Sequence, residues 1–270
     1  MDISFSKDSF SQTKLFIGAP MYGGMSTSSC LKGMIDLSTA CILYDIPFSV
    51  CGVTNQSLVQ KARNFCVDSF LRSDYTHFLF IDADIGFTAK DVLSLLYLLA
   101  SDKEKKYDVL AGLYPKKNIS WKTVRSAANK GLSDEDADSL ENHTGIYPLL
   151  TSIENSFSSI APIEVLKVDA GFMMVPRRTF EKFKETYPEN KYLIPKGKEE
   201  FAFFNCAIDP ETKYYITEDH RFCQCVRKMG GKIWAAPWLK LTHQGSYSFK
   251  GSFENTMATQ HGPSRENIPS

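Results

Sequence analysis

Four consecutive apolar residues, from Phe78 to Ile81, are followed directly by two aspartates, Asp82 and Asp84. An uninterrupted apolar run of this length is typical of a parallel strand that is buried on both faces. Because Asp82 and Asp84 lie two residues apart, both carboxylates can face one point on a turn that leaves the strand. Carboxylates at the C-terminal end of a parallel strand are suited to hold Mg²⁺ or Mn²⁺ against a substrate phosphate. The sequence therefore favours an enzyme that acts on a phosphorylated small molecule.

The Asp-x-Asp pattern is common, and on its own it also fits solvated loop carboxylates or a helix cap. A metal held at this position would clamp a diphosphate and stabilise the charge that develops on it as a leaving group. The apolar strand before the pattern favours the metal-binding interpretation, and the motifs further along the chain decide between the two.

Composition sets broad limits on this chain of 270 residues, which is long enough for one large α/β domain or two small ones. Lys plus Arg and Asp plus Glu both number 31, so no overall field selects nucleic acid or an anionic membrane. No run of 18 apolar residues occurs, so we expect no membrane span, and residues 1–14 lack the order of a signal peptide. Seven cysteines with irregular spacing and no paired zinc pattern predict free thiols in a reducing cytosol.

Apolar periodicity predicts alternating strands and helices over the first half of the chain. Strands are expected at 15–20, 46–53, 78–81 and 109–112, with helices after Ser26–Ser29, at 58–71 and at about 89–99. The helix at 58–71 is expected to bury Val59, Ala62, Phe65, Cys66 and Phe70. This alternation predicts a parallel sheet with right-handed crossovers.

The second half of the chain is less regular. Residues 118–160 are polar and show no clear period, which predicts either a long excursion over the active face or partial disorder. Regular structure resumes at 165–175, followed by helices at about 178–185 and 218–229 and a late strand at 232–237. Gly230 and Gly231 predict a helix C-cap, and the polar residues after Phe253 predict a mobile tail.

Two carboxylates open the helix expected at 218–229. Thr217 can cap that helix, and acidic residues suit a helix N-terminus. In a functional interpretation, Glu218 or Asp219 projects into the cleft as a general base and takes the proton of an acceptor hydroxyl. Both interpretations stay open, because one carboxylate can cap while the other works.

A histidine near the end of the chain is a candidate metal ligand. His243 follows the apolar residues 239–241 and precedes Gly245 by two positions. A lone histidine is more often a structural hydrogen-bonding residue, but its neutral imidazole can also bind a metal. In a chain that also carries Asp-x-Asp and Glu218-Asp219, we favour the ligand.

Three further positions carry polar groups that suit a substrate. Arg63 and Asn64 precede the Asp-x-Asp strand by one crossover and can reach a nucleotide or support the aspartates, although a solvated helix face is the alternative. Lys116 begins a basic run that extends to Lys130 and fits phosphate binding, a polyanionic acceptor such as DNA, or a solvated loop. Asp169, beside a glycine and an aromatic residue, suits sugar hydroxyls, and a plain turn aspartate is equally consistent.

The order of these motifs resembles that of glycosyltransferases with the GT-A fold, close to family-2-like enzymes and their small phage and viral relatives. The match covers most of the chain, from Leu15 to about Tyr247. It consists of Ile17-Gly18-Ala19-Pro20, Ala62-Arg63-Asn64, Phe80-Ile81-Asp82-Ala83-Asp84 as the DxD motif, Asp169-Ala170-Gly171-Phe172, Glu218-Asp219 and His243-x-Gly245. No single motif is decisive, and the ordered set is fairly specific.

The resemblance implies an α/β fold in which a Rossmann-like nucleotide-binding sheet is flanked by helices, with a smaller acceptor-side subregion. A single GT-A domain would hold the nucleotide sugar in a half at about 14–117 and the acceptor in a half at about 118–250, with a flexible tail at 254–270. The chain lacks the Gln-x-x-Arg-Trp motif of larger family-2 enzymes, which argues against a processive polysaccharide synthase.

The resemblance also implies residue roles. Asp82 and Asp84 would hold Mn²⁺ or Mg²⁺ at the donor diphosphate, with His243 as a further ligand. The nucleotide and its phosphates would contact Ala19, Pro20, Tyr22, Arg63, Asn64, Asp82 and Lys116. The transferred sugar or the acceptor would contact Asp169, Gly171 and Phe172. Glu218 or Asp219 would be the catalytic base of an inverting enzyme, and a retaining mechanism stays open.

The implied reaction is metal-dependent transfer of a sugar from a UDP- or GDP-sugar to the hydroxyl of a glycan or, as the less favoured acceptor, a hydroxylated DNA base. We expect a cytoplasmic enzyme, in the host cytoplasm if the gene comes from a phage. A nucleotidyltransferase acting on a sugar phosphate should carry a basic residue near the first strand, and none lies between Leu15 and Leu31. A non-catalytic nucleotide-sugar-binding module is disfavoured by the complete set of site residues.

Overall fold

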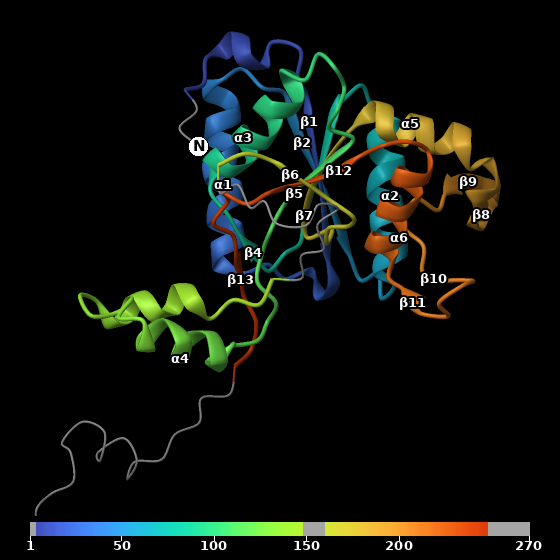
Figure 1. Cartoon of the computed structure of the whole chain (residues 1–270). Helices are drawn as coiled ribbons and strands as arrows, with labels where there is room; N and C mark the ends of the chain where they lie inside the picture. The colour runs from blue at the N-terminus through green and yellow to red at the C-terminus, as the bar shows by residue number, and fades with distance from the viewer. Residues whose placement is uncertain (1–3, 148–159, 248–270) are drawn as a thin grey trace, which may run out of the picture.

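A seven-stranded mixed sheet forms the centre of the molecule (Figure 1). The computed structural model describes residues 4–147 and 160–247. The strands lie in the order β2-β1-β3-β7-β5-β12-β6. Their bounds are β1 Leu15–Met21, β2 Phe48–Thr54, β3 His77–Ile81, β5 Val109–Gly112, β6 Ile163–Val165, β7 Phe172–Pro176 and β12 Ile233–Ala236. The expected α/β class, with a Rossmann-like sheet flanked by helices, is confirmed.

Helices cover both faces of this sheet (Figure 1). One face is covered by α1 (Ser28–Leu43) and α3 (Ala89–Ala100), and the other by α2 (Val59–Leu71), α5 (Arg177–Thr186) and α6 (Glu218–Lys228). Each face has its own continuous cluster of buried apolar side chains. The sheet is therefore the middle layer of three, which is the arrangement that α/β alternation in sequence favours.

The position of β3 in the sheet explains why residues 78–81 are all apolar. Phe78 and Phe80 belong to the cluster beneath α2, α5 and α6, whereas Leu79 and Ile81 belong to the cluster beneath α1 and α3. Because alternate residues of a strand face opposite sides of the sheet, a strand that is covered on both sides must be apolar throughout. The predicted buried strand is confirmed, since every residue of β3 is buried.

The sheet departs from the predicted parallel arrangement at β6 and β7. Strand β7 lies between β3 and β5 and runs antiparallel to both, and β6 runs antiparallel to β12 at the edge. The other five strands are mutually parallel. The prediction of regular structure at 165–175 is confirmed at its two ends, in Val165 of β6 and in β7, but it was wrong for residues 166–171, which cross from the outermost strand of the sheet to its middle. Periodicity reveals that a strand is buried, but it does not reveal the direction of the strand.

Helix α2 buries Ala62, Cys66 and Phe70 as predicted, but the buried face is shifted away from Val59 and Phe65 and toward two polar residues. Val59 and Phe65 are 38% and 43% exposed, whereas Arg63 and Asn64 are both 4% exposed. A segment from the second half of the chain covers this side of the helix. The Asn64 amide donates to the Phe204 carbonyl at 3.0 Å and accepts from the Phe204 N–H at 2.8 Å. The apolar periodicity of α2 cannot reveal that a residue 140 positions later covers this side of the helix.

Shorter elements surround the sheet. Helix α4 (Trp121–Asn129) and the 3-10 helix η3 (Ala137–His143) occupy part of the segment for which an excursion or partial disorder was predicted, and they stand away from the sheet as an arm (Figure 1). The rest of that prediction, for 148–159, and the predicted tail lie outside the described residues. The remaining elements are η1 Lys7–Phe10, η2 Tyr22–Gly24, η4 Pro188–Asn190, η5 Pro195–Gly197, β4 Ile85–Gly86, β8 Lys191–Ile194, β9 Lys198–Phe201, β10 Ala207–Ile208, β11 Tyr215–Ile216 and β13 Thr242–His243.

Helix α6 ends as predicted. Gly230 has a φ of +84°, a left-handed conformation that a glycine adopts without steric cost, and it follows the C-cap residue Met229, so the helix ends at Lys228. The seven cysteines are all free thiols, which also agrees with the sequence analysis. None of the described helices combines the length and the apolar composition that crossing a membrane requires.

Aromatic rings fill the cluster beneath α6. Phe222 is fully buried and stacks on Phe204 with ring centroids 4.6 Å apart. It also contacts Phe180 at 5.6 Å and Phe183 at 5.8 Å. Ring pairs of this kind stabilise a core beyond the area that they bury. This cluster joins α5, α6 and the segment that carries Phe204.

We expect Phe222→Ala to lower the free energy of unfolding by about 3–5 kcal/mol, because it removes a large buried ring and leaves a cavity. The matched control is Phe65→Ala, which removes the same ring from a position that is 43% exposed and should cost about 1 kcal/mol or less. Urea denaturation measures both values. Equal losses in the two variants would contradict the burial described for α2 and α6.

Candidate functional site

The predicted site residues gather at the C-terminal ends of the parallel strands, which form one edge of the sheet. The parallel strands β1, β3 and β5 end at this edge, and β7, which runs the other way, begins there. Asp82 follows β3 and Gly171 precedes β7, and the Asp82 N–H donates to the Gly171 carbonyl at 2.9 Å. Ligands of open α/β sheets bind at the carboxyl ends of the parallel strands, so this edge is the place for a site.

A short strand pair brings His243 to the Asp-x-Asp turn. Strands β13 and β4 pair with His243 opposite Ile85, and the Gln244 N–H donates to the Asp84 carbonyl at 2.9 Å. His243 Nε2 lies 3.6 Å from Asp84 Oδ2 as a result. Two of the three predicted metal ligands therefore lie side by side, although they are far apart in the chain.

The hydrogen bond of His243 defines where its proton lies. Nδ1 is 2.9 Å from the Pro115 carbonyl, and a carbonyl can only accept, so Nδ1 carries the hydrogen. In the neutral ring, Nε2 then presents a lone pair toward Asp84. A carboxylate oxygen and an imidazole lone pair that face each other are a donor set suited to a divalent cation.

A lysine contacts the second aspartate of the turn. Lys117 Nζ forms an ion pair with Asp84 Oδ2 at 2.5 Å. The lysine predicted to contact the substrate, Lys116, is exposed and donates its backbone N–H to the Ile146 carbonyl at 2.9 Å. Lys117 was part of the predicted basic run but was not assigned to the site. Both lysines follow β5, so the edge of the sheet carries positive charge close to the aspartates.

A buried arginine links the aspartate turn to α6. The Arg63 side chain is 5% exposed, with Nη2 at 3.1 Å from Asp82 Oδ2 and Nε at 3.5 Å from Glu218 Oε1. The guanidinium also lies over the Phe80 ring, 5.0 Å from its centroid. Neither Nη1 nor Nε has a hydrogen-bond partner among the described residues, and the contact to Glu218 counts only as an ion pair. A buried donor without a partner is costly, and Arg63 keeps its place through the two carboxylates that it faces.

The two carboxylates at the start of α6 are held differently. Thr217 is the N-cap residue, but its hydroxyl donates to Asp219 Oδ1 at 2.6 Å instead of capping the backbone. The His220 N–H donates to the same oxygen at 2.7 Å. Within the described part of the chain, Asp219 Oδ2 receives only a 3.4 Å contact from the Ala170 N–H. Glu218 faces Arg63 through Oε1 at 3.5 Å and its side chain is 12% exposed, whereas Asp219 keeps Oδ2 with one long contact.

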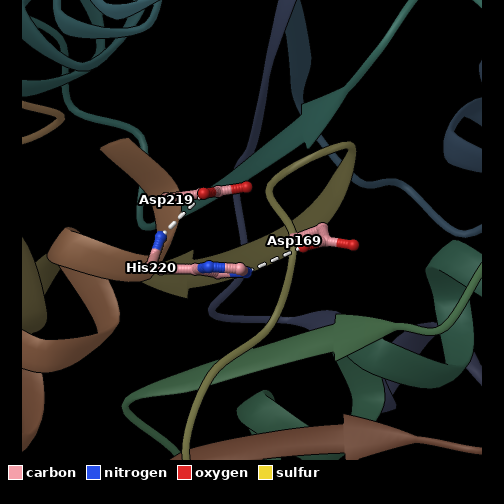
Figure 2. Close-up of side chains that lie close together, drawn as sticks. All are labelled: Asp169, Asp219 and His220. Carbon is pink, nitrogen blue, oxygen red and sulfur yellow. Dashed lines mark hydrogen bonds and ion pairs between the residues drawn. The ribbon is translucent and has the colours of Figure 1, made fainter. Parts of the chain in front are cut away.

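His220 completes a second cluster of ligand-type side chains (Figure 2). One ligand atom from each of Asp169, Asp219 and His220 lies within 4.8 Å of the others. His220 Nε2 is 3.0 Å from Asp169 Oδ1. The cluster could hold a cation, which makes it a second candidate metal position besides Asp84 and His243. Sequence reasoning did not select His220, although its place directly after Asp219 was a usable signal.

Gly171 has no room for a side chain. A Cβ at this position would lie 2.5 Å from Tyr114 Oη and 3.0 Å from Asp82 Oδ2. The Gly171 N–H donates to the Tyr114 hydroxyl at 3.0 Å, and the Tyr114 ring packs edge-on against His243 at 5.2 Å. Sequence reasoning missed Tyr114, and its position directly before Pro115 at the end of β5 was the only signal.

Two residues predicted to contact a ligand use their side chains inside the protein. Phe172 is fully buried and packs against Phe87 with ring centroids 5.5 Å apart. Asn64 uses its amide on the backbone of Phe204. Both residues lie next to positions that face the site, and proximity in sequence does not distinguish a side chain that points into the core.

A cleft of about 690 Å³ opens beside the Asp-x-Asp turn. Its lining includes Pro20, Tyr22, Gln56, Asp82, Asp84 and Gln244. The third predicted pocket residue, Ala19, is buried. The volume lies within the range of about 300–1,000 Å³ that small-molecule sites occupy. Two of the predicted nucleotide-pocket residues thus share a cleft with both aspartates.

No protein-family model matches the chain, and no curated protein is similar to it in sequence. Among solved structures, A197 from STIV is similar over 87% of this chain and 87% of its own, with 19% identity and a TM-score of 0.46. GalNAc-T7 with UDP, GalNAc and Mn²⁺ matches over 91% of this chain, with 11% identity and a TM-score of 0.47, and this chain spans 47% of it.

A third solved structure is the catalytic domain of Drosophila β1,4-galactosyltransferase 7 in complex with xylobiose. It matches over 92% of this chain and 79% of its own, with 10% identity and a TM-score of 0.40. Identities and TM-scores at this level describe a loose likeness between folds. We take no residue role and no activity from them.

A pH-dependent stability follows from the surroundings of Glu218. Burial raises the pKa of this carboxyl, the Asp219 charge acts in the same direction, and Arg63 opposes both. The ionised form therefore costs stability in the folded chain. We expect Glu218→Gln to raise the free energy of unfolding at pH 7.5. The gain should vanish below the ordinary glutamate pKa of about 4.3, where the wild-type carboxyl is protonated in both states.

Urea denaturation of Glu218→Gln at pH 7.5 and pH 4 measures this effect. Glu185→Gln, an exposed position on α5, is the matched control and should change little at either pH. A Glu218→Gln variant that is less stable than wild type at pH 7.5 would contradict the described environment of the carboxyl.

Proposed function

We propose that this chain is a metal-dependent glycosyltransferase of the GT-A type. It would move a sugar from a UDP- or GDP-sugar to a hydroxyl of a glycan or, as the less favoured acceptor, of a hydroxylated DNA base. The observation that supports this best is Asp84, which is approached by His243 and lines the same cleft as Asp82, Pro20 and Tyr22. Residues 14–117 would form the nucleotide-sugar half and residues 118–250 the acceptor half.

Asp84 and His243 would hold Mn²⁺ or Mg²⁺, with Asp82 as a further ligand. The carboxylate oxygen and the Nε2 lone pair fit such an ion, and the mixed oxygen and nitrogen set favours Mn²⁺ over Mg²⁺. When bound, a divalent ion supplies positive charge to the departing diphosphate. Lys117 neutralises Asp84 in the structure and would contact a donor phosphate once the metal charge replaces it.

The donor would lie in the 690 Å³ cleft. Pro20 and Tyr22 would line the pocket for the base and ribose, because both border the cleft and the Tyr22 ring is 74% exposed. Arg63 would hold Asp82 through Nη2 and add positive charge beside the donor diphosphate. A guanidinium that is fixed before the substrate arrives stabilises developing charge without reorganisation.

Asp219 is the residue that we favour as the catalytic base. Its Oδ1 is fixed by Thr217 and His220, which leaves Oδ2 to take the proton of the attacking hydroxyl. Glu218 is occupied by Arg63 and would hold that arginine in place. The neighbouring Asp169 would bind a hydroxyl of the acceptor or of the transferred sugar.

Donor hydrolysis tests the proposed reaction. The purified protein is incubated with UDP-, GDP-, CMP- and TDP-sugars in Mn²⁺ or in EDTA. We expect release of one nucleotide in Mn²⁺ only, and a loss of at least about a hundredfold in Asp219→Asn, because the general base and its effect of about 10²–10⁴ are removed. If no donor is hydrolysed and calorimetry detects no metal-dependent nucleotide binding, the proposal fails and a non-catalytic module becomes the better description.

Metal binding distinguishes the two candidate metal positions. We expect Asp84→Asn and His243→Gln to weaken Mn²⁺ binding by about a hundredfold or more, since even residues that only support a ligand are worth about 10–100-fold. His220→Gln should leave Mn²⁺ affinity within about twofold of wild type. Titration of Mn²⁺ followed by electron paramagnetic resonance measures free ion directly. Loss of affinity in His220→Gln alone would move the metal to the cluster of Asp169, Asp219 and His220.

A further inference from the structure

The two ring nitrogens and the backbone N–H of His220 each contact a different residue. Its backbone N–H donates to Asp219, its Nε2 lies 3.0 Å from Asp169 Oδ1, and its Nδ1 lies 3.3 Å from Lys167 Nζ. Figure 2 shows the His220 ring extending from the start of α6 toward Asp169. The side chain of His220 is 24% exposed and that of Asp169 is 32% exposed, so both are only partly accessible to solvent.

These contacts define the tautomer of His220. A lysine ammonium can only donate, so Nδ1 must accept from Lys167, and the ring hydrogen then lies on Nε2. Nε2–H in turn donates to the Asp169 carboxylate. The order is the reverse of that in His243, where Nδ1 carries the hydrogen and Nε2 is free. The two histidines of the site are therefore held in opposite tautomers.

The tautomer also separates the roles of the two histidines. Nε2 of His243 offers a lone pair, whereas both ring nitrogens of His220 are engaged, one as an acceptor and one as a donor. A cation at Asp169 and His220 would have to displace the Nε2 hydrogen and would lie near the Lys167 charge. The short distances in this cluster are thus explained by hydrogen bonds.

The histidine bond leaves Asp169 half occupied. His220 holds Oδ1, and among the described residues no other side chain donates a hydrogen bond to this carboxylate. An aspartate on a loop needs such a partner to keep one orientation, because an unfixed carboxylate rotates freely. Its second oxygen remains available to accept a hydrogen bond from a hydroxyl.

We propose that Lys167 and His220 are positioning residues that hold the Asp169 carboxylate to receive a hydroxyl of the acceptor, or the water that replaces it in donor hydrolysis. The chain of hydrogen bonds runs from Lys167 Nζ through His220 to Asp169, and we call it the relay. This inference rests on the proposed transferase function for its substrate, but the tautomer that it requires is independent of any activity.

The tautomer is tested first. A long-range ¹H–¹⁵N spectrum of the full chain at pH 7.5 reports the protonation of each histidine nitrogen, and the signals of His220 and His243 are assigned by their loss in His220→Gln and His243→Gln. We expect His220 with its hydrogen on Nε2 and His243 with its hydrogen on Nδ1. A His220 with its hydrogen on Nδ1, or with both nitrogens protonated, overturns the relay.

Kinetics test what the relay does. We expect His220→Leu to lower kcat for metal-dependent donor hydrolysis by about tenfold or more while the KM for the donor stays unchanged, because a misplaced group costs rate rather than donor binding. His220→Gln, whose amide can donate to Asp169, should recover part of the rate, and Lys167→Met should lose less than His220→Leu. His143→Gln and Lys103→Met, which lie outside the site, are the matched controls.

The outcomes separate this inference from the proposed function. Wild-type protein without metal-dependent hydrolysis would refute the transferase, and the tautomer spectrum would still decide the relay. Hydrolysis in wild type with an unchanged kcat in His220→Leu would refute the relay and leave the transferase standing. A His220→Leu variant with weakened Mn²⁺ affinity would show that His220 is a metal ligand, which also overturns the relay.

Discussion

The buried guanidinium of Arg63 is the interaction on which the site depends. It faces Asp82 at the end of β3 and Glu218 at the start of α6, so it ties the aspartate turn to a helix more than 130 residues later. A charge buried to 5% exposure is tolerated only with partners of opposite sign, and here Asp82 hydrogen-bonds the guanidinium directly while Glu218 adds an ion pair. The same arginine therefore fixes the geometry of both predicted carboxylate motifs.

The antiparallel strand β7 has an equally large effect on the site. Because β7 begins where β3 ends, the loop before it comes to the edge where the aspartates lie, and the Gly171 carbonyl accepts from the Asp82 N–H. A parallel strand in the same place would have delivered that loop to the opposite edge. The close packing of Tyr114 and Asp82 around Gly171 follows from this meeting of chain segments, and it leaves no space for a Cβ.

The elements and residues that the sequence predicted correctly depend on near neighbours in the chain. The β3 strand, the turn after it, α6 and its glycine stop were predictable, because each depends on neighbours within a few residues. Lys117, Tyr114 and His220 were missed, and Asn64 and Phe172, which were predicted to contact a ligand, use their side chains inside the protein. In each of these cases the deciding neighbour lies far away in sequence.

Local sequence was enough to predict the α/β class, the buried strand that ends in two aspartates, and the polar residue types available to a site. These properties are local, since apolar period and turn chemistry act over one or two turns of chain. The tertiary structure alone decided that His243 meets Asp84 through the β4–β13 pair, that Arg63 is buried between two carboxylates, and that His220 and His243 carry opposite tautomers. The reason is that each of these pairings joins groups that only the closure of the sheet and its covering helices brings within bonding distance.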